Sequence, residues 1–173
     1  MELNHYNIKL RLVEIADADF IIKLRTDSSK SRFISKTDSN VQEQENWIAK
    51  YKERELIGEE YYFIAIDEND VKFATYRLYN KTIKSIEIGS FVSKPRYDKP
   101  LNVIKVDIIL KAFVFKNLGY DELTFEVRKD NKSVINYHKK FNPTIIREDE
   151  QNFYFILERE SFFKNKDKFE KLF

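Results

Sequence analysis

The sequence predicts an α+β protein whose mixed β-sheet of six to seven strands carries helices on both faces. Runs typical of strands and of helices follow one another in the order β-α-α-β-β-β-α-β-α-β-β. Three of the strands are consecutive and are separated by short polar turns, which predicts an antiparallel meander. A strand, a helix and another strand come next, and such a crossover joins parallel neighbours in one sheet.

The first half of the chain is expected to contain two helices. Asp17 can cap a helix over 18–27, and a second helix over 41–56 has an apolar stripe that includes Trp47. The polar segment 28–40 between them is expected to be a loop. Alternating or apolar runs predict the strands of this half at 8–15, 61–67, 71–79 and 85–92.

The second half begins with a strongly apolar helix. It is expected over 101–119, with Gly119 where a helix C-cap belongs. A shorter helix over 131–141 has Asn131 or Asp130 as its N-cap. The remaining predicted elements are strands at 121–128, 144–149 and 152–158 and an amphipathic helix in the tail 159–173.

Composition excludes several classes of site. The 173 residues suit a single domain, which we expect to span 1–173, and 42% apolar residues are enough for a core. The absence of cysteine excludes disulfides, thiolate metal sites and a cysteine nucleophile. The two histidines, His5 and His138, are too few for a histidine-rich metal site, so we expect no metal.

Charge and hydropathy limit the partners. The formal net charge is +2, from 31 basic and 29 acidic residues mixed along the chain, which gives no electrostatic reason to expect nucleic acid. No apolar run approaches the roughly 18 residues of a membrane span, and the start "MELNHYNIKL" lacks the apolar core of a signal peptide. We therefore expect a soluble, cytoplasmic protein that acts on a small molecule. A homodimer through the aromatic tail stays open.

Three stretches carry a resemblance to a known family. "IKLRLVEIADADFIIKLRTDS" is similar to the opening strand and helix of ribosomal-protein-alanine acetyltransferases. "EIGSFVSKP" resembles the central strand of the GNAT superfamily of N-acetyltransferases, and "NLGYDELTFEVRKDNKSVINYHKKFNPTII" resembles a later strand and helix of that superfamily. A narrower likeness, to a bacterial subgroup associated with surface-glycan and sugar-nucleotide pathways, rests on "LRTDSSKSRFIS", "QENWIAKYKERELIGEEYYFIAI", "YRLYN" and "FEVRKDNKSVINYHKKFNP".

The resemblance covers nearly the whole chain and implies a splayed GNAT sheet that uses acetyl-CoA as co-substrate. Two parallel strands, 88–92 and 123–127, are expected to diverge and admit the thioester arm. The acceptor implied by the subgroup is the primary amine of an amino-sugar nucleotide, and a protein N-terminal amine is the alternative. The implied cofactor-binding residues are Ser90, Phe91, Val92, Leu101, Asn102, Val103 and Asn131.

One departure from the family concerns the loop that binds the pyrophosphate. The matching stretch, Ser93–Val106, contains no glycine, and glycine normally lets backbone N–H groups approach a phosphate closely. The helix N-terminus that follows is expected to compensate, together with the charges of Lys94, Arg96 and Lys99. A non-catalytic GNAT-like binding domain is therefore a further alternative.

Two residues are candidates for proton transfer. His138 stands where the family usually has tyrosine, and an imidazolium can protonate the leaving thiolate, whereas the alternative is a surface histidine. Glu87, on the same strand face as Gly89, is the candidate general base, and a salt-bridged surface carboxylate is its alternative. Asn131 would bond the pantetheine arm or only cap its helix.

Arg25 and Arg77 are the candidate acceptor-binding residues. A guanidinium suits two-point binding of a phosphate or a carboxylate. Arg25 ends the first helix, which borders the acceptor cleft in the family, and Arg77 lies on the third predicted strand. For either arginine alone, an ordinary surface salt bridge is the simpler explanation.

Overall fold

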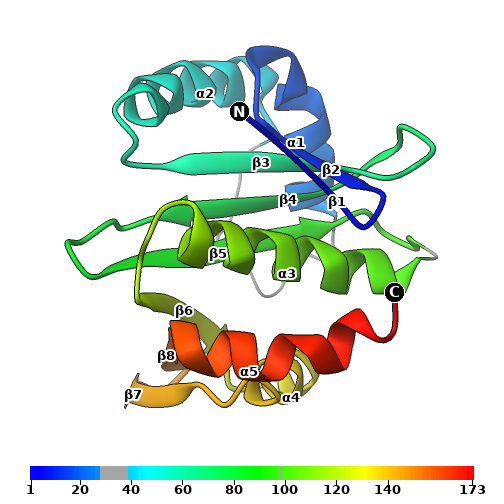
Figure 1. The fold of residues 1–173 in the computed structure, drawn as a ribbon. Coiled ribbons are helices and arrows are strands. Elements are labelled where there is room, and N and C mark those ends of the chain that lie inside the picture. Colours follow the sequence, from blue (N-terminus) through cyan, green and yellow to red (C-terminus); the bar gives the residue numbers. More distant parts are fainter. Residues whose placement is uncertain (28–38, 98) are drawn as a thin grey trace.

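Eight strands form one β-sheet within the described residues of the computed structural model, which are 1–27, 39–97 and 99–173 (Figure 1). The predicted α+β class and mixed sheet are confirmed, and the sheet has one strand more than the upper end of the expected range. The strands are β1 (Glu2–His5), β2 (Ile8–Leu12), β3 (Tyr61–Ile66), β4 (Lys72–Tyr79), β5 (Ser85–Ser93), β6 (Glu122–Arg128), β7 (Thr144–Glu148) and β8 (Asn152–Glu158). Their order is β1-β2-β3-β4-β5-β6-β8-β7, and neighbours are antiparallel except the parallel pair β5 and β6.

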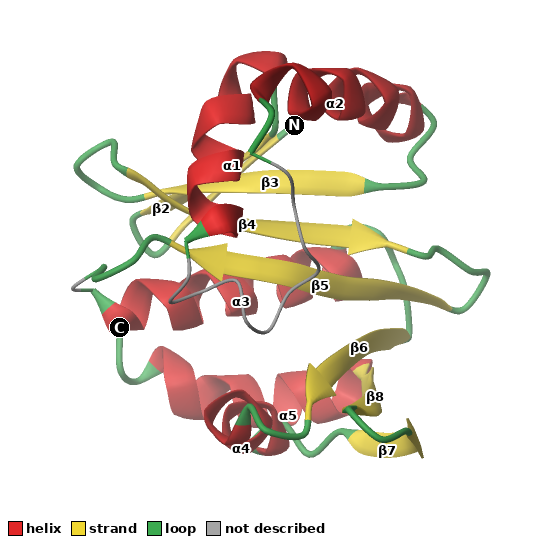
Figure 2. Ribbon diagram, turned by 180° about the vertical axis from the view of Figure 1, so that it is seen from behind, coloured by secondary structure: helices red, strands yellow, loops and turns green. Residues whose placement is uncertain are grey.

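Helices cover both faces of the sheet. The α-helices are α1 (Ala18–Thr26), α2 (Val41–Leu56), α3 (Pro100–Lys116), α4 (Lys132–Lys139) and α5 (Arg159–Glu170). α1 and α2 lie on one face, and α3 and α5 lie on the other (Figure 1 and Figure 2). Of the predicted loop 28–40, the part 28–38 lies outside the described residues. None of the described helices is both long and apolar enough to cross a membrane.

The additional strand is β1, which pairs with β2 through a two-residue turn. The turn residues Tyr6 and Asn7 have positive φ angles of 52° and 61°. Such left-handed backbone is typical of tight hairpin turns, which sequences normally signal with Asn-Gly or Asp-Gly. The Tyr-Asn turn has no glycine, and for this reason the sequence did not predict a strand before Ile8.

Asp17 stands before α1 as predicted, but its side chain does not cap the helix. The carboxylate, which is 1% exposed, instead accepts hydrogen bonds from Arg11 (2.7 and 2.8 Å) and Lys72 (2.7 Å). Burial would raise the pKa of Asp17, but the hydrogen bonds from these two cations lower it to about 2. The expected helix cap is therefore wrong, and Asp17 ties β2 and β4 to the start of α1.

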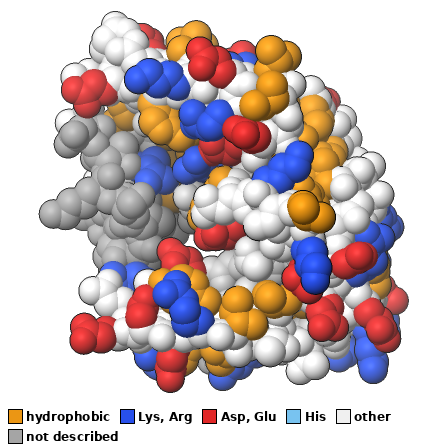
Figure 3. Space-filling model, turned by 90° about the vertical axis from the view of Figure 1, so that its left-hand side faces the viewer, with side chains coloured by type: hydrophobic (Ala, Val, Ile, Leu, Met, Phe, Trp, Pro, Cys, Tyr) orange, Lys and Arg blue, Asp and Glu red, His pale blue; other side chains and the backbone are white. Residues whose placement is uncertain are grey.

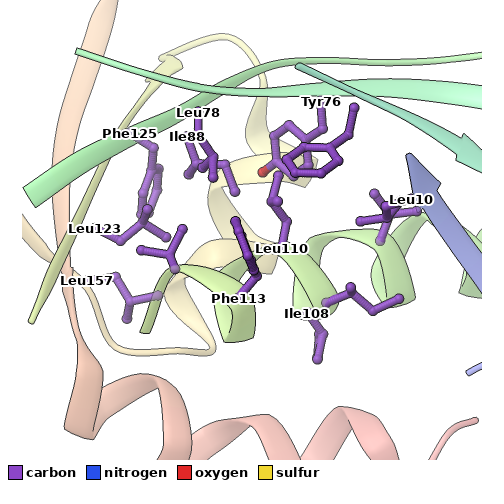
Figure 4. Close-up of a cluster of buried hydrophobic side chains, with 14 of the residues drawn as sticks. Leu10, Tyr76, Leu78, Ile88, Ile108, Leu110, Phe113, Leu123, Phe125 and Leu157 are labelled. Atoms are coloured by element: carbon purple, nitrogen blue, oxygen red, sulfur yellow. The ribbon is translucent and has the colours of Figure 1, made fainter. Parts of the chain in front are cut away.

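The main core lies between the sheet and α3. Side chains from β2, β4, β5, β6 and β8 pack toward this helix (Figure 4). α3 is apolar on nearly every side because the sheet covers one face and α5 packs against another. After α3, Gly119 adopts a φ of 79°, and the N–H of Tyr120 bonds back to the carbonyl oxygen of Val114 (3.3 Å). The helix itself ends at Lys116 with Asn117 as its C-cap, two residues before the predicted C-cap, and Gly119 provides the left-handed turn that follows.

Candidate active site

The strands β5 and β6 are paired over only part of their length. Parallel pairing joins Ser85–Glu87 to Glu122–Thr124, whereas β6 stays paired with β8 as far as Arg128. Beyond these pairs the two strands diverge (Figure 2). The structure therefore has the splay expected between 88–92 and 123–127.

A β-bulge in β5, where Ser90 and Phe91 stand opposite Tyr76 of β4, shapes one wall of this splay. The register between β4 and β5 shifts between Thr75 and Arg77, and Ser90 on β5 has a φ of 54°. Bulges re-aim strand residues, and here every residue from Ile88 to Ser93 lines the same groove.

The groove has a volume of about 520 Å³. Its walls come from β5, β6, the first turns of α3, and α4, with Tyr76 added from β4. The predicted cofactor-binding residues that line it are Ser90, Phe91, Val92, Val103 and Asn131. Leu101 and Asn102 do not line it, since Leu101 is 40% exposed at the start of α3 and Asn102 is buried.

The N-terminus of α3 differs from the expectation. The backbone N–H of Asn102 donates to the carbonyl oxygen of Lys99 (3.1 Å), and the Asn102 side chain donates to the Tyr97 hydroxyl (2.8 Å). The Lys99 ammonium bonds to Asp67 (3.2 Å) and Glu68 (2.9 Å), which follow β3. Asn102 and Lys99 therefore have protein partners, and the roles expected of them at a phosphate stay predictions.

Lys94 and Arg96, in contrast, are exposed. Arg96 has a φ of 53°, the left-handed conformation that glycine adopts without steric cost. The loop thus contains one glycine-like backbone position without a glycine. The two side chains stay candidates for contact with a pyrophosphate.

Asn131 precedes α4, but its side chain makes no capping bond to that helix. Its amide oxygen accepts a hydrogen bond from the Ser133 hydroxyl (3.3 Å), and the residue lines the groove. Helix capping by the side chain therefore does not explain the asparagine. Its contact with acyl-CoA stays a prediction.

A buried ion pair lies beside the groove. α3 carries Asp107 and Lys111 one turn apart, and Lys111 Nζ lies 2.6 Å from the Asp107 carboxylate. The hydroxyls of Tyr76 and Tyr137 donate to the same carboxylate at 2.8 and 2.6 Å. Lys111, whose side chain is 0% exposed, also places Nζ 3.2 Å from Nδ1 of His138. One polar network therefore joins α3, α4 and β4.

Sequence reasoning missed Asp107 and Lys111 as site residues. The signal is two opposite charges four residues apart in a helix that the sequence predicts to be strongly apolar. Buried charges are normally retained only when they are paired. Such a pair therefore marks the face of a core helix that meets other polar groups.

His138 lies in the groove wall but not in the expected charge state. It is 8% exposed, and its ring packs on Phe125 with 4.5 Å between the ring centroids. Burial and the neighbouring Lys111 cation lower the pKa of His138 to about 3, although Asp107 opposes the change. The lowered pKa favours a neutral ring at pH 7 over the expected imidazolium, and the role of His138 as an acid stays a prediction. The alternative of a surface histidine is wrong.

Glu87 is not among the residues that line the groove. It is paired with Tyr79 in the ladder between β5 and β4, and its carboxylate accepts a hydrogen bond from the Asn80 amide (2.8 Å). Burial, the negative charge of Glu87 and a hydrogen bond to it raise the pKa of Tyr79. Glu87 is thus a partnered, half-buried carboxylate, and its role as a base stays a prediction.

Arg77 is surrounded by aromatic rings. Its guanidinium carbon lies 4.9 Å from the ring centre of Trp47 and 5.4 Å from that of Tyr62. The guanidinium forms an ion pair with Glu60, which is buried and whose second oxygen accepts a hydrogen bond from Arg54 (2.6 Å). Arg77 therefore forms the salt bridge expected from the sequence as the alternative to binding an acceptor.

Arg25, in the last turn of α1, interacts electrostatically with Tyr62. Burial raises the pKa of Tyr62, while a hydrogen bond with Thr75 and the positive charges of Arg25 and Arg77 oppose the rise. The structure thus brings the two predicted arginines together around Tyr62. Figure 3 views the end of the molecule where β4 turns into β5, and charges of both signs are mixed there with hydrophobic side chains.

Comparisons with known proteins agree with this geometry. The family model described as an acetyltransferase (GNAT) domain matches residues 7–142. Apo FdhC, described as a nucleotide-linked sugar GNAT, is 34% identical with a TM-score of 0.87 over 98% of this chain and 97% of that chain. A ribosomal-protein-alanine acetyltransferase from Vibrio fischeri is 12% identical with a TM-score of 0.79, over 94% of this chain and 98% of that chain. A mutant of SpeG spermidine N-acetyltransferase from Vibrio cholerae is 12% identical with a TM-score of 0.76, over 92% and 98%.

A search of curated proteins found no significant match. The two structures at 12% identity share the fold alone. The family model, in contrast, covers most of the chain, and FdhC is similar along nearly its whole length. The chain therefore belongs to the GNAT family of acetyltransferases and is an acyltransferase.

Proposed function

We propose that the chain transfers an acetyl group from acetyl-CoA to the primary amine of an amino sugar that is linked to a nucleotide. The observation that supports this most strongly is the 34% identity, over 98% of the chain, to a protein described as a nucleotide-linked sugar GNAT. In this proposal the groove between β5 and β6 binds the thioester arm. The amine approaches from the face of the sheet that α1 and α2 cover.

The groove has the chemistry that a thioester arm needs. The edge of β5 at Ser90–Val92 is not paired with β6, so its backbone N–H and C=O groups can bond to the amides of the pantetheine arm. Asn131 offers a side-chain amide from the opposite wall. Lys94 and Arg96, near the open end, would supply charge to the pyrophosphate in place of a glycine-rich cradle.

Acyl transfer needs a neutral amine that attacks the thioester carbonyl and a proton for the departing thiolate. Glu87 is the proposed base, directly or through a water molecule, because it lies on β5 two residues before Gly89, which borders the groove. His138 stands at the closed end of the groove, next to the point where β5 and β6 separate.

The arginines around Tyr62 support an anionic acceptor. Arg77 and Arg54 share one carboxylate, that of Glu60, so this pair of cations carries a positive charge in excess. Arg25 adds a further positive charge near Tyr62. A diphosphate is complementary to this arrangement, whereas the positively charged amino terminus of a protein would be matched by an acidic cleft.

Release of free thiol from acetyl-CoA tests the proposed acceptor. The protein is assayed with a panel of nucleotide-linked amino sugars, with the matching free amino sugars, with spermidine and with a peptide that begins with alanine. We expect turnover with a nucleotide-linked amino sugar and at least about tenfold lower kcat/KM with the matching free sugar, because the nucleotide contributes binding energy. Turnover with the peptide or spermidine but with no nucleotide-linked sugar would contradict the proposal.

A further inference from the structure

We infer that His138 acts as a neutral imidazole whose Nε2–H donates a hydrogen bond to the carbonyl oxygen of the acyl thioester, and that Lys111 and Asp107 fix this form. Lys111 and Asp107 are positioning residues, because they act on the acyl group only through His138. The inference rests on the proposed binding of acyl-CoA in the groove.

The contact between Lys111 and His138 determines which ring nitrogen carries the proton. Lys111 Nζ lies 3.2 Å from Nδ1 of His138, and an ammonium group has three N–H donors and no acceptor. Nδ1 therefore accepts, which leaves the proton of the neutral ring on Nε2. An imidazolium could not accept this bond and would place two cations side by side in the core.

Asp107 keeps Lys111 charged. Burial lowers the pKa of Lys111, but the carboxylate 2.6 Å from Nζ opposes this change. Burial would raise the pKa of Asp107, yet Lys111 and the hydrogen bond from Tyr137 hold it below its usual value. The ring centre of Phe141, 4.4 Å from Nζ, adds a cation–π contact. The ion-pair geometry with Asp107 makes Lys111 the donor to Nδ1.

The second ring nitrogen of His138 is open to the groove. His138 lines the groove, and within the described residues no protein group bonds to its Nε2. Nε2 of His138 is absent from the fully enclosed side-chain atoms that lack a hydrogen bond in the described part of the chain, so it is accessible from the groove. A donor in such a position is satisfied by solvent or by a ligand in the groove.

His138 lies at the end of the groove where the thioester belongs. Its ring packs on Phe125, which directly follows Thr124, the last residue of β6 that pairs with β5. The opposite end of the groove leads to α3 and the candidate pyrophosphate loop. Tyr76 and Tyr137 also line the groove, but their hydroxyl protons are donated to Asp107. His138 is therefore the remaining side-chain donor at the closed end, among the described residues.

A fixed neutral donor suits the chemistry of the thioester. Attack by the amine moves the π electrons of the carbonyl onto its oxygen, and a donor already in place stabilises that charge. Lys111 polarises the ring through Nδ1 and itself stays outside the groove. Loss of one such donor typically lowers kcat by about 100- to 1000-fold.

Nitrogen-15 NMR of histidine-labelled protein tests the tautomer without an activity assay. The chain has two histidines, so His5→Gln leaves His138 as the sole source of signal. We expect the neutral Nε2–H form from pH 7 to pH 5, because the pKa of His138 is about 3. A neutral Nδ1–H ring or an imidazolium at pH 7 in the folded protein overturns the inference.

Lys111→Met in the same background tests the positioning role. We expect the Nδ1–H form or a protonated ring to become populated, since Nδ1 has lost its donor. This variant leaves Asp107 buried without its partner and can unfold, so Asp107→Asn combined with Lys111→Met serves as the second test. An unchanged Nε2–H ring in a folded variant overturns the role of Lys111.

Infrared spectroscopy of bound acetyl-CoA, labelled with carbon-13 at the carbonyl, tests the contact with the acyl group. A donated hydrogen bond lowers the carbonyl stretching frequency, so the band of the wild-type complex should lie below that of free acetyl-CoA. His138→Gln, whose amide N–H reaches the place of Nε2, should keep part of the shift, and the shorter His138→Asn should lose it. An unshifted band in the wild-type complex overturns the inference and leaves the proposed function standing. Failure of acetyl-CoA to bind at millimolar concentration overturns both.

Discussion

The side chain of Tyr79 on β4 lies diagonally over Gly89 on β5, whose register partner is Arg77. A Cβ added at Gly89 would lie 2.3 Å from the Tyr79 hydroxyl oxygen. The negative charge of Glu87 acts on that hydroxyl, and the guanidinium carbon of Arg77 lies 5.0 Å from the centre of the tyrosine ring. Glycine is therefore needed here for close approach of a side chain rather than for an unusual φ.

Gly89→Ala is expected to lower the free energy of unfolding by about 1–3 kcal/mol, because Tyr79 must move. In a Tyr79→Phe background the oxygen is absent, and the nearest ring atom would be 3.1 Å from the new Cβ. The same substitution should then cost about 1 kcal/mol less. Urea unfolding of the four proteins measures this coupling. Equal costs in the two backgrounds would show that the hydroxyl is not the obstacle.

At the scale of elements, buried carboxylates tie two helices to the sheet. Asp17, at the start of α1, bonds to Arg11 of β2 and Lys72 of β4. Asp107, on α3, accepts hydrogen bonds from Lys111 and from the tyrosine hydroxyls of β4 and α4. Each network joins elements that are distant in the sequence and so fixes their relative positions. Removing one partner of such a buried ion pair lowers the stability of the fold strongly, because the other charge stays buried without a partner.

The acid stability of the fold should contain a component from Asp17. Its pKa is about 2 in the folded protein against an ordinary value of 3.8, so the ionised carboxylate stabilises the fold above about pH 4. This contribution is lost as the pH falls toward 2. The difference in unfolding free energy between the wild type and Asp17→Asn should therefore be constant from pH 7 to pH 5 and then shrink by about 1–2 kcal/mol, a figure reduced for the partial exposure of Arg11 and Lys72.

Urea unfolding of both proteins at each pH measures this difference. The other carboxylates are common to the two proteins and cancel in the comparison. A difference that stays constant down to pH 2 would show that Asp17 titrates alike in the folded and unfolded chains.

At the scale of the whole molecule, the sequence predicts the features that depend on neighbouring residues and misses those that depend on residues far away in the chain. α2 has its predicted bounds because a helix cap and an apolar stripe are local features. β1 was missed because its turn uses left-handed backbone at Tyr6 and Asn7 without a glycine. His138 was found from a motif, but its charge depends on Lys111, 27 residues away in the sequence. The partners of Lys99 likewise come from another hairpin, which no pattern within the loop reveals.

The two parts of the sheet meet at the short parallel pairing of Ser85–Glu87 with Glu122–Thr124. Acyl-CoA in the groove would contact both parts and stabilise the native state by mass action. At a concentration 100 times Kd the gain is about 2.7 kcal/mol, which corresponds to a rise in Tm of roughly 5–10 °C for a chain of this size. Scanning calorimetry with and without acetyl-CoA measures the rise.

Ser133→Trp is the matched control, because Ser133 is exposed on α4 and lines the groove. The ligand-free Tm of this variant should stay within about 2 °C of the wild type, as for most surface substitutions. The indole should occupy the groove and abolish the rise caused by acetyl-CoA. A rise in both proteins would place the ligand outside the groove. No rise in either would favour a GNAT-like domain that does not bind acyl-CoA.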